Sequence, residues 1–105
     1  MNALGPLPTL ALDGDRAGAP ATVPIVLKLF ATLARFMPEG SARNEIRIAV
    51  PEGTTPADII RVLNLPVALC ALVLIDGVFI EPEARATRVL KAEERFAIWP
   101  PVAGG

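Results

Sequence analysis

The sequence contains no histidine, no tyrosine and a single cysteine, Cys70. These absences exclude a Cys/His metal cluster, a disulfide framework and a nucleophile paired with a histidine base inside this chain. An iron–sulfur ferredoxin is excluded too, because one cysteine cannot ligate a cluster. We therefore expect no bound metal, no bound cofactor and little side-chain catalysis.

An excess of charge and a long apolar run are also missing. Ten Lys plus Arg against eleven Asp plus Glu give a net charge of -1, so the basic surface of a nucleic-acid binder is not expected. The best apolar run, residues 67–75, is much shorter than the roughly 18 to 20 residues that span a bilayer. Prolines interrupt the N-terminal leucines, which makes a poor secretory signal. We expect a cytoplasmic protein without nucleic-acid or membrane partners.

The length of 105 residues suits one domain. Residues 1–24 hold four prolines and three glycines without helical or strand periodicity, and we interpret them as a flexible extension. Residues 25–99 are predicted to form the folded domain, and residues 100–105 a functional tail.

Hydrophobic periodicity predicts an α+β fold. Five short apolar runs are predicted as strands: residues 25–30, 44–50, 72–75, 78–80 and 95–99. The Asp76-Gly77 pair between the third and fourth runs is typical of a hairpin turn. Ile46, Ile48 and Val50 are expected to point into the core.

Two helices are predicted between the strands. Residues 31–37 contain good helix formers and end before Pro38. The second helix has the clearer start, because Thr55 can cap it, Pro56 suits its first position and Asp58 completes a capping box. The charged residues that follow the hairpin are predicted to form a solvated edge: Glu81, Glu83, Arg85 and Arg88.

The final ten residues, FAIWPPVAGG, carry the strongest functional signal. An apolar strand stops at two prolines, and no side chain beyond Val102 is larger than a methyl group. The prolines lower the entropy cost of an extended tail, and two glycines let the backbone approach a reactive centre closely. Residues 100–105 could reach roughly 20 Å into a narrow channel. The chemically unusual group is then the α-carboxylate of Gly105.

Four segments in this order, VLKLFATLARF, TTPADIIRVLNLP, VLIDG and IWPPVAGG, resemble the β-grasp sulfur carriers, most closely the small subunit of molybdopterin synthase. The resemblance covers residues 25–105, and the PPVAGG tail is its specific part. It implies a β-grasp, ubiquitin-like fold, in which a mixed sheet packs against one main helix and a flexible diglycine tail follows.

The resemblance also implies a function as a sulfur carrier in molybdenum cofactor biosynthesis. A ubiquitin-activating-type enzyme would use ATP to adenylate the Gly105 carboxylate, and sulfur from a sulfurtransferase would replace AMP to give a thiocarboxylate. The sequence has no GxxxxGK loop, so ATP binding belongs to the partner. The tail would thread into the large synthase subunit and donate sulfur to the pterin precursor; its threading residues would be Pro100, Pro101, Val102, Ala103 and Gly104.

Individual side chains allow more than one interpretation. Trp99 is a candidate partner contact, since tryptophan is enriched in interface hot spots, but a core position under the prolines fits equally well. Phe79 is a second candidate contact with the same alternative. Phe96 and Ile98 are predicted to be core residues. Cys70 is interpreted as a small buried hydrophobe rather than a sulfur relay.

The family pattern leaves two departures and three alternative functions. Members usually carry a Gly-Asp turn before the last strand, whereas residues 91–95 differ, and residues 1–24 have no counterpart.

The carrier chemistry could serve another pathway, such as a tungsten cofactor or thiamin thiazole, although the paired prolines argue against the thiazole carrier. A ubiquitin-like modifier would join Gly105 to a lysine. A non-covalent β-grasp module would tolerate a C-terminal tag, which the carriers and the modifier cannot.

Overall fold

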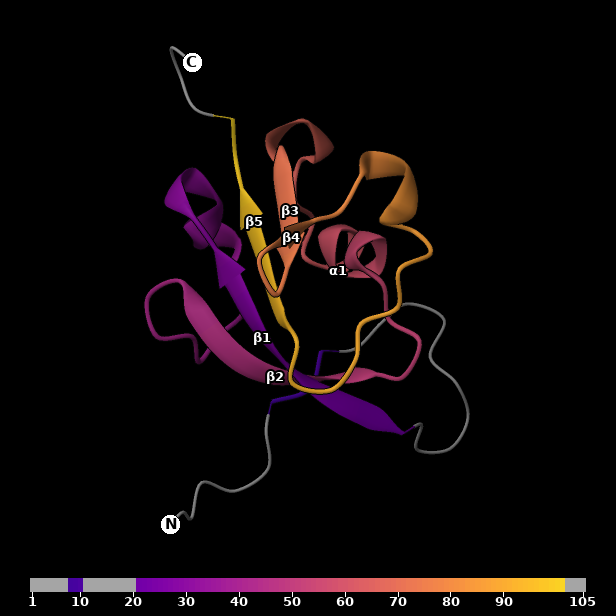
Figure 1. The fold of residues 1–105 in the computed structure, drawn as a ribbon. Helices are drawn as coiled ribbons and strands as arrows, with labels where there is room; N and C mark the ends of the chain where they lie inside the picture. The colour runs from indigo at the N-terminus through magenta and orange to yellow at the C-terminus, as the bar shows by residue number, and fades with distance from the viewer. Residues whose placement is uncertain (1–7, 11–20, 102–105) are drawn as a thin grey trace.

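Five strands form one mixed sheet in the computed structural model, in the order β2-β1-β5-β3-β4 (Figure 1). The structure describes residues 8–10 and 21–101. The central strands β1 and β5 run parallel, and the other neighbours are antiparallel. The α+β class is as predicted. The strands are β1 (Thr22–Leu29), β2 (Glu45–Pro51), β3 (Leu72–Ile75), β4 (Val78–Phe79) and β5 (Arg95–Trp99).

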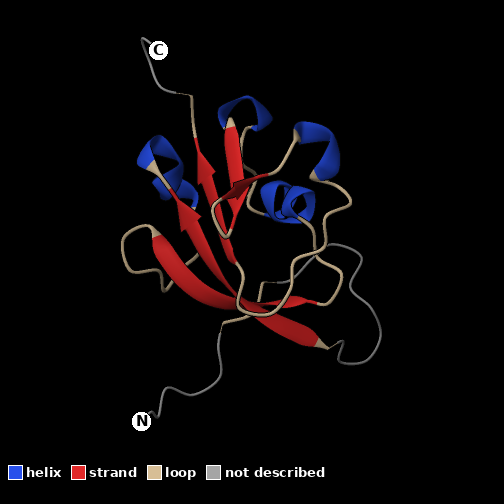
Figure 2. Cartoon of the chain, viewed as in Figure 1, coloured by secondary structure: helices blue, strands red, loops and turns tan. Residues whose placement is uncertain are grey.

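Within the described residues the connections hold one α-helix, α1 (Pro56–Val62), and the 3-10 helices η1 (Ala31–Phe36), η2 (Val67–Leu69) and η3 (Pro82–Ala84) (Figure 2). None of them is long and apolar enough to cross a bilayer. The α-helix predicted over residues 31–37 is a 3-10 helix instead. Its six residues lie between extended residues at both ends, and such short pieces favour the tighter helix.

The start of α1 confirms the predicted capping box. The Asp58 amide donates to the Thr55 side-chain oxygen at 3.3 Å, and the Thr55 amide donates to the Asp58 carboxylate at 3.0 Å. Two amides that have no partner inside the helix are thereby satisfied. This cap orients α1 so that Ile59 and Ile60 are buried.

The core lies between α1 and one face of the sheet. Ile46, Ile48 and Val50 point inward as predicted, with 7%, 1% and 0% of their surface exposed. Phe96 and Ile98 are fully buried, which confirms the core positions predicted for them. The other buried members are Ile25, Leu27, Leu29, Leu33, Ile59, Ile60, Leu65, Cys70, Val73, Ile75, Ile80 and Leu90.

Two turns set the course of the chain around β5. Asp76 and Gly77 both have positive φ, 52° and 83°, as in the hairpin turns that Asp-Gly favours, and the predicted hairpin is confirmed. Before β5, Glu93 has φ 67° and the Glu94 amide donates to the Lys91 carbonyl at 3.1 Å. A glutamate in the left-handed region therefore makes the turn here.

The start of β1 differs from the predicted domain boundary, because the strand begins at Thr22 rather than at residue 25. Pro24 is tolerated in β1 because its partner Ala49 needs no hydrogen bond from it: the amide and the carbonyl of Ala49 both bond to residues 8–10 at the outer edge of β2. The nitrogen of Pro24 lies on the side of β1 that pairs with β5, but this pairing begins only at Val26, so no ladder bond is lost. Residues 8–10 also pair with β2. Such pairing uses backbone atoms, which no side-chain pattern reveals; residues 1–7 and 11–20 lie outside the described residues.

Candidate functional site

Alternate residues of β5 lie on opposite faces of the sheet. Phe96 and Ile98 point into the core under α1, whereas Arg95, Ala97 and Trp99 point to the other face, which we call the open face. Trp99 has 37% of its surface exposed. One short strand thus supplies both core residues and a surface tryptophan.

Trp99 is held in place by its neighbours. Its ring stacks on Phe30, with ring centroids 3.8 Å apart and an angle of 3° between the planes. Phe30 directly follows β1, and its amide donates to the Ile98 carbonyl at 3.1 Å, so the stack joins the ends of β1 and β5. Across β5, Leu72 pairs with Trp99 and is 46% exposed. Trp99 is therefore a partly exposed residue packed on one side, which is intermediate between the partner contact and the core position that the sequence allowed.

Trp99 belongs to a group of apolar side chains on the open face. Leu74 pairs with Ala97 on one side and with Phe79 on the other, so these three side chains share the face. Phe79 is 41% exposed, and a shallow hollow of about 380 Å³ opens beside Leu74 and Trp99. Clustered exposed apolar residues mark interaction sites. This group, the apolar patch, consists of Phe30, Leu72, Leu74, Phe79, Ala97 and Trp99.

Charged groups also lie on the open face, at Lys28, which pairs with Ala97 of the patch, and around the start of β5. The Lys28 Nζ lies 3.6 Å from Glu45 Oε1, and the Asp76 carboxylate accepts a hydrogen bond from the Arg95 amide at 2.8 Å. Arg95 lies at the start of β5 and Trp99 at its end, and β1 runs in the same direction beside it. Within the patch, Phe30, Leu72 and Trp99 lie at the end where the chain leaves the sheet, and the other three members lie level with Lys28.

The chain leaves the sheet through two prolines beside the apolar patch. The Ala71 amide donates to the Trp99 carbonyl at 3.1 Å, which anchors β5 just before the prolines. Pro100 is buried and Pro101 is exposed, and neither has an N–H that could extend the ladder. The other residues of the predicted tail lie outside the described residues: Val102, Ala103, Gly104 and Gly105.

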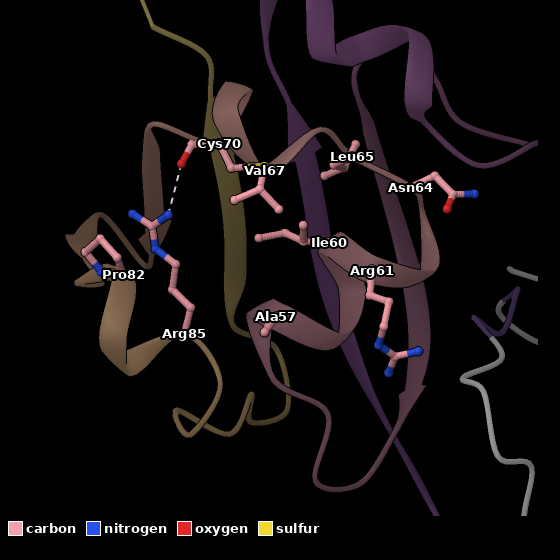
Figure 3. A pocket seen from close by; sticks show the side chains of 9 residues that line it. All are labelled: Ala57, Ile60, Arg61, Asn64, Leu65, Val67, Cys70, Pro82 and Arg85. Carbon is pink, nitrogen blue, oxygen red and sulfur yellow. Dashed lines mark hydrogen bonds between the residues drawn. The ribbon is translucent and has the colours of Figure 1, made fainter.

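Cys70 lies away from the open face, beside a hollow of about 540 Å³ between α1, η2 and η3 (Figure 3). Its surface is 4% exposed, which confirms the prediction of a small buried residue. Burial raises the pKa of the thiol, although the positive charge of Arg85 opposes this shift. The effect of burial is the larger of the two, so the thiol stays protonated near neutral pH.

The prediction of a solvated charged edge is wrong for Arg85. Its guanidinium donates to the carbonyls of Cys70 at 2.9 Å and Ile80 at 3.0 Å, as Figure 3 shows for Cys70. These bonds join η3 to the segments on both sides of the β3–β4 hairpin. The residues it contacts lie 5 and 15 positions away along the chain, so no periodic pattern marked it.

The same prediction is wrong for Arg88. Its guanidinium pairs with the Glu94 carboxylate at 2.7 Å, and the Glu94 side chain is only 13% exposed. Burial favours the neutral form of Glu94, but hydrogen bonds from Arg88 and from the Lys91 amide outweigh burial and lower its pKa. The Arg88–Glu94 pair stabilises the turn that leads into β5, the strand that ends at Trp99.

The open face suits binding rather than side-chain catalysis. Its exposed residues near the tail are aromatic or aliphatic, without a nucleophile or an acid–base pair among them. In the part of the chain that the structure describes, no three His, Cys, Asp or Glu side chains are grouped so that they could hold a metal ion. What the site offers is an apolar surface beside an outgoing, proline-stiffened strand.

Comparisons with known proteins inform the fold. No protein-family model and no curated protein matches the sequence. A solution structure of the HVO 2177 protein from Haloferax volcanii matches this chain with a TM-score of 0.66 and 22% sequence identity, covering 90% of this chain and 98% of that one. The chain therefore shares its overall fold with the Haloferax volcanii HVO 2177 protein.

Proposed function

We propose that this chain is a β-grasp, ubiquitin-like sulfur carrier of molybdenum cofactor biosynthesis, the small subunit of a cytoplasmic molybdopterin synthase. One observation carries the proposal: β5 leads directly into the PPVAGG segment at the end of the sheet where Phe30, Leu72 and Trp99 of the apolar patch lie. The parallel pair β1–β5 at the centre of the sheet and the single α-helix among the described residues support the fold assignment.

The chemistry belongs to the carboxylate of Gly105. A free carboxylate is a poor acyl donor, so a ubiquitin-activating-type partner first joins it to AMP from ATP and releases pyrophosphate. A thiol reductant releases sulfur at the oxidation level of sulfide from the persulfide of a sulfurtransferase, and this sulfur then attacks the carbonyl carbon. The C–S bond forms as the C–O bond to AMP breaks, and AMP leaves with the electron pair. The thiocarboxylate is the sulfur donor for the pterin precursor.

The patch and the prolines have separate tasks in this proposal. Burying Trp99 and Phe79 against the large synthase subunit gives affinity, because aromatic side chains in desolvated contacts dominate interface energies. Pro100 and Pro101 restrict the base of the tail and lower the entropy cost of inserting it into a channel. Partner binding and sulfur delivery would then be adjacent but separable.

Tail variants test the proposal directly. Deleting Gly105, or adding one residue after it, is expected to abolish thiocarboxylate formation by the adenylating enzyme, ATP and the sulfurtransferase. The far-UV circular dichroism spectrum should not change, because the altered position lies outside every described helix and strand. A residue added before Met1 is the matched control and should leave thiocarboxylate formation intact.

The outcomes separate this function from its alternatives. A thiocarboxylate that converts the pterin precursor with the large subunit supports the proposal. A thiocarboxylate without that conversion indicates a carrier for another pathway, and a Gly105–lysine bond in cell extract indicates a protein modifier. Full function with a C-terminal tag contradicts every version that uses the Gly105 carboxylate.

A further inference from the structure

The described residues cover the outer edge of β2 only in part. Near its start, Ala42 and Glu45 exchange two backbone hydrogen bonds of 3.0 Å. Further along, the Ala49 amide donates to the Pro8 carbonyl at 2.8 Å, and the Leu10 amide donates to the Ala49 carbonyl at 2.9 Å. Residues 8–10, which we call the strap, thus lie parallel to β2 and are joined to it by these two bonds.

Two prolines remove hydrogen bonds next to the strap. The next bond of a parallel ladder would run from the amide of residue 8 to the Arg47 carbonyl, but Pro8 has no N–H. On the other side, the Leu10 carbonyl would need the amide of residue 51, which is Pro51. Pro8 and Pro51 therefore remove the next ladder bond on each side of the strap, and the side chain of Leu10 packs against the core.

Arg47 lies on this edge of β2, between Glu45 and Ala49, which both have backbone partners there. Arg47 faces the same edge as Glu45 and Ala49, since alternate residues of a strand direct their backbone groups to the same side. On that edge its backbone has no hydrogen bond to any described residue. A hollow of about 580 Å³ lies here, lined by residues that include Pro8, Ala42 and Arg47.

We propose that the outer edge of β2 is a strand-addition site for an extended polypeptide segment of a partner protein, and that the strap occupies part of it in cis. The partner segment runs parallel to β2 from the hollow toward Ala49. It carries an apolar side chain at the position of Leu10 and a residue with an N–H at the position of Pro8. Unpaired strand edges accept such segments through main-chain hydrogen bonds.

The partner segment has a defined advantage over the strap. With an N–H at the position of Pro8 it can reach the Arg47 carbonyl, which the strap cannot. One added backbone hydrogen bond corresponds to about a two- to tenfold gain in affinity. The site and its competitor are independent of the tail chemistry at Gly105.

Three synthetic peptides of residues 4–14 test this edge: the natural sequence, its Pro8→Ala form, and the Pro8→Ala form with N-methylleucine at position 10. The last peptide is the matched control, since it keeps the leucine side chain and loses the N–H that bonds to Ala49. The receptor is the full-length, isotope-labelled chain with Leu10→Pro, which disables the strap, and binding is followed by the backbone amide signals in NMR spectra.

We expect the Pro8→Ala peptide to bind about two- to tenfold more tightly than the natural peptide and to shift the amides of Arg47 and Ala49. The N-methyl peptide should lose this binding, and the unmodified full-length chain should bind every peptide more weakly because its strap competes. If the Leu10→Pro chain does not fold, the unmodified chain with excess Pro8→Ala peptide gives the same shifts and releases its own Leu10 amide.

Equal binding of the N-methyl and Pro8→Ala peptides would overturn the proposal, as would shifts on the open face instead of β2, or no shifts at millimolar peptide. Dimerisation of the Leu10→Pro chain through β2 without peptide would overturn the assignment to a partner protein.

Discussion

Replacing Trp99 by alanine separates the two roles assigned to the faces of β5. Ile98 is fully buried, whereas Trp99 is 37% exposed and is supported mainly by its stack on Phe30. An aromatic stack contributes about 0.5–1.5 kcal/mol beyond its buried area, so Trp99→Ala should cost about 1–2 kcal/mol with its partial burial included. Ile98→Ala removes core atoms and should cost about 2–5 kcal/mol.

Urea unfolding measured by far-UV circular dichroism is the assay, because Trp99 is the only tryptophan and its fluorescence is lost in the variant. Both variants should keep the denaturant dependence of the parent, which is set by the surface exposed on unfolding. In the binding assay, Trp99→Ala should weaken association with the large synthase subunit. Ile98→Val is a conservative core control that should leave this association unchanged.

An equal loss of stability in Trp99→Ala and Ile98→Ala would refute this separation of the two faces. Trp99 would then be a core residue whose exposure has no functional meaning. Binding of Trp99→Ala to the large subunit with the affinity of the parent chain would refute the proposed interface.

Three further predictions concern stability and reactivity. Thr55→Ala should lower the free energy of unfolding by about 1 kcal/mol because it removes the cap of α1, while Thr55→Ser should cost much less; thermal unfolding measures both. The pKa of Glu94 is lowered in the folded state, so its stabilising effect is present above about pH 5 and is lost as the pH falls through that lowered pKa. Glu94→Gln should accordingly cost about 1–3 kcal/mol near neutral pH and almost nothing in strong acid, which urea unfolding across pH will show. Cys70 should react with iodoacetamide much more slowly in the native chain than in urea, because burial raises the thiol pKa; equal rates would contradict its buried position.

Local chemistry made several elements predictable from the sequence. Thr55, Pro56 and Asp58 define the start of α1 through short-range capping, and Asp76-Gly77 defines a turn by its backbone preference. Strict alternation identified the inward residues of β2 and β5. In each case the cause lies within a few residues of the chain.

The features that the sequence did not predict depend on contacts between distant residues. The strap bonds residues 8–10 to Ala49 through backbone atoms, so it leaves no side-chain pattern. The Arg85 bonds and the Arg88–Glu94 pair join side chains to groups across turns. The apolar patch likewise depends on the pairing of β3 with β5, which places Leu72 opposite Trp99.

The central claim is that the Gly105 carboxylate carries sulfur, and the intact mass of the chain tests it most directly. The protein is purified with an untagged C-terminus from its native host and is measured before and after incubation with ATP, a sulfur source and the host adenylating enzyme. We predict a gain of about 16 Da, the mass of sulfur less that of oxygen, which fragmentation places on Gly105. An unchanged mass with an adenylating enzyme shown to be active would contradict the claim.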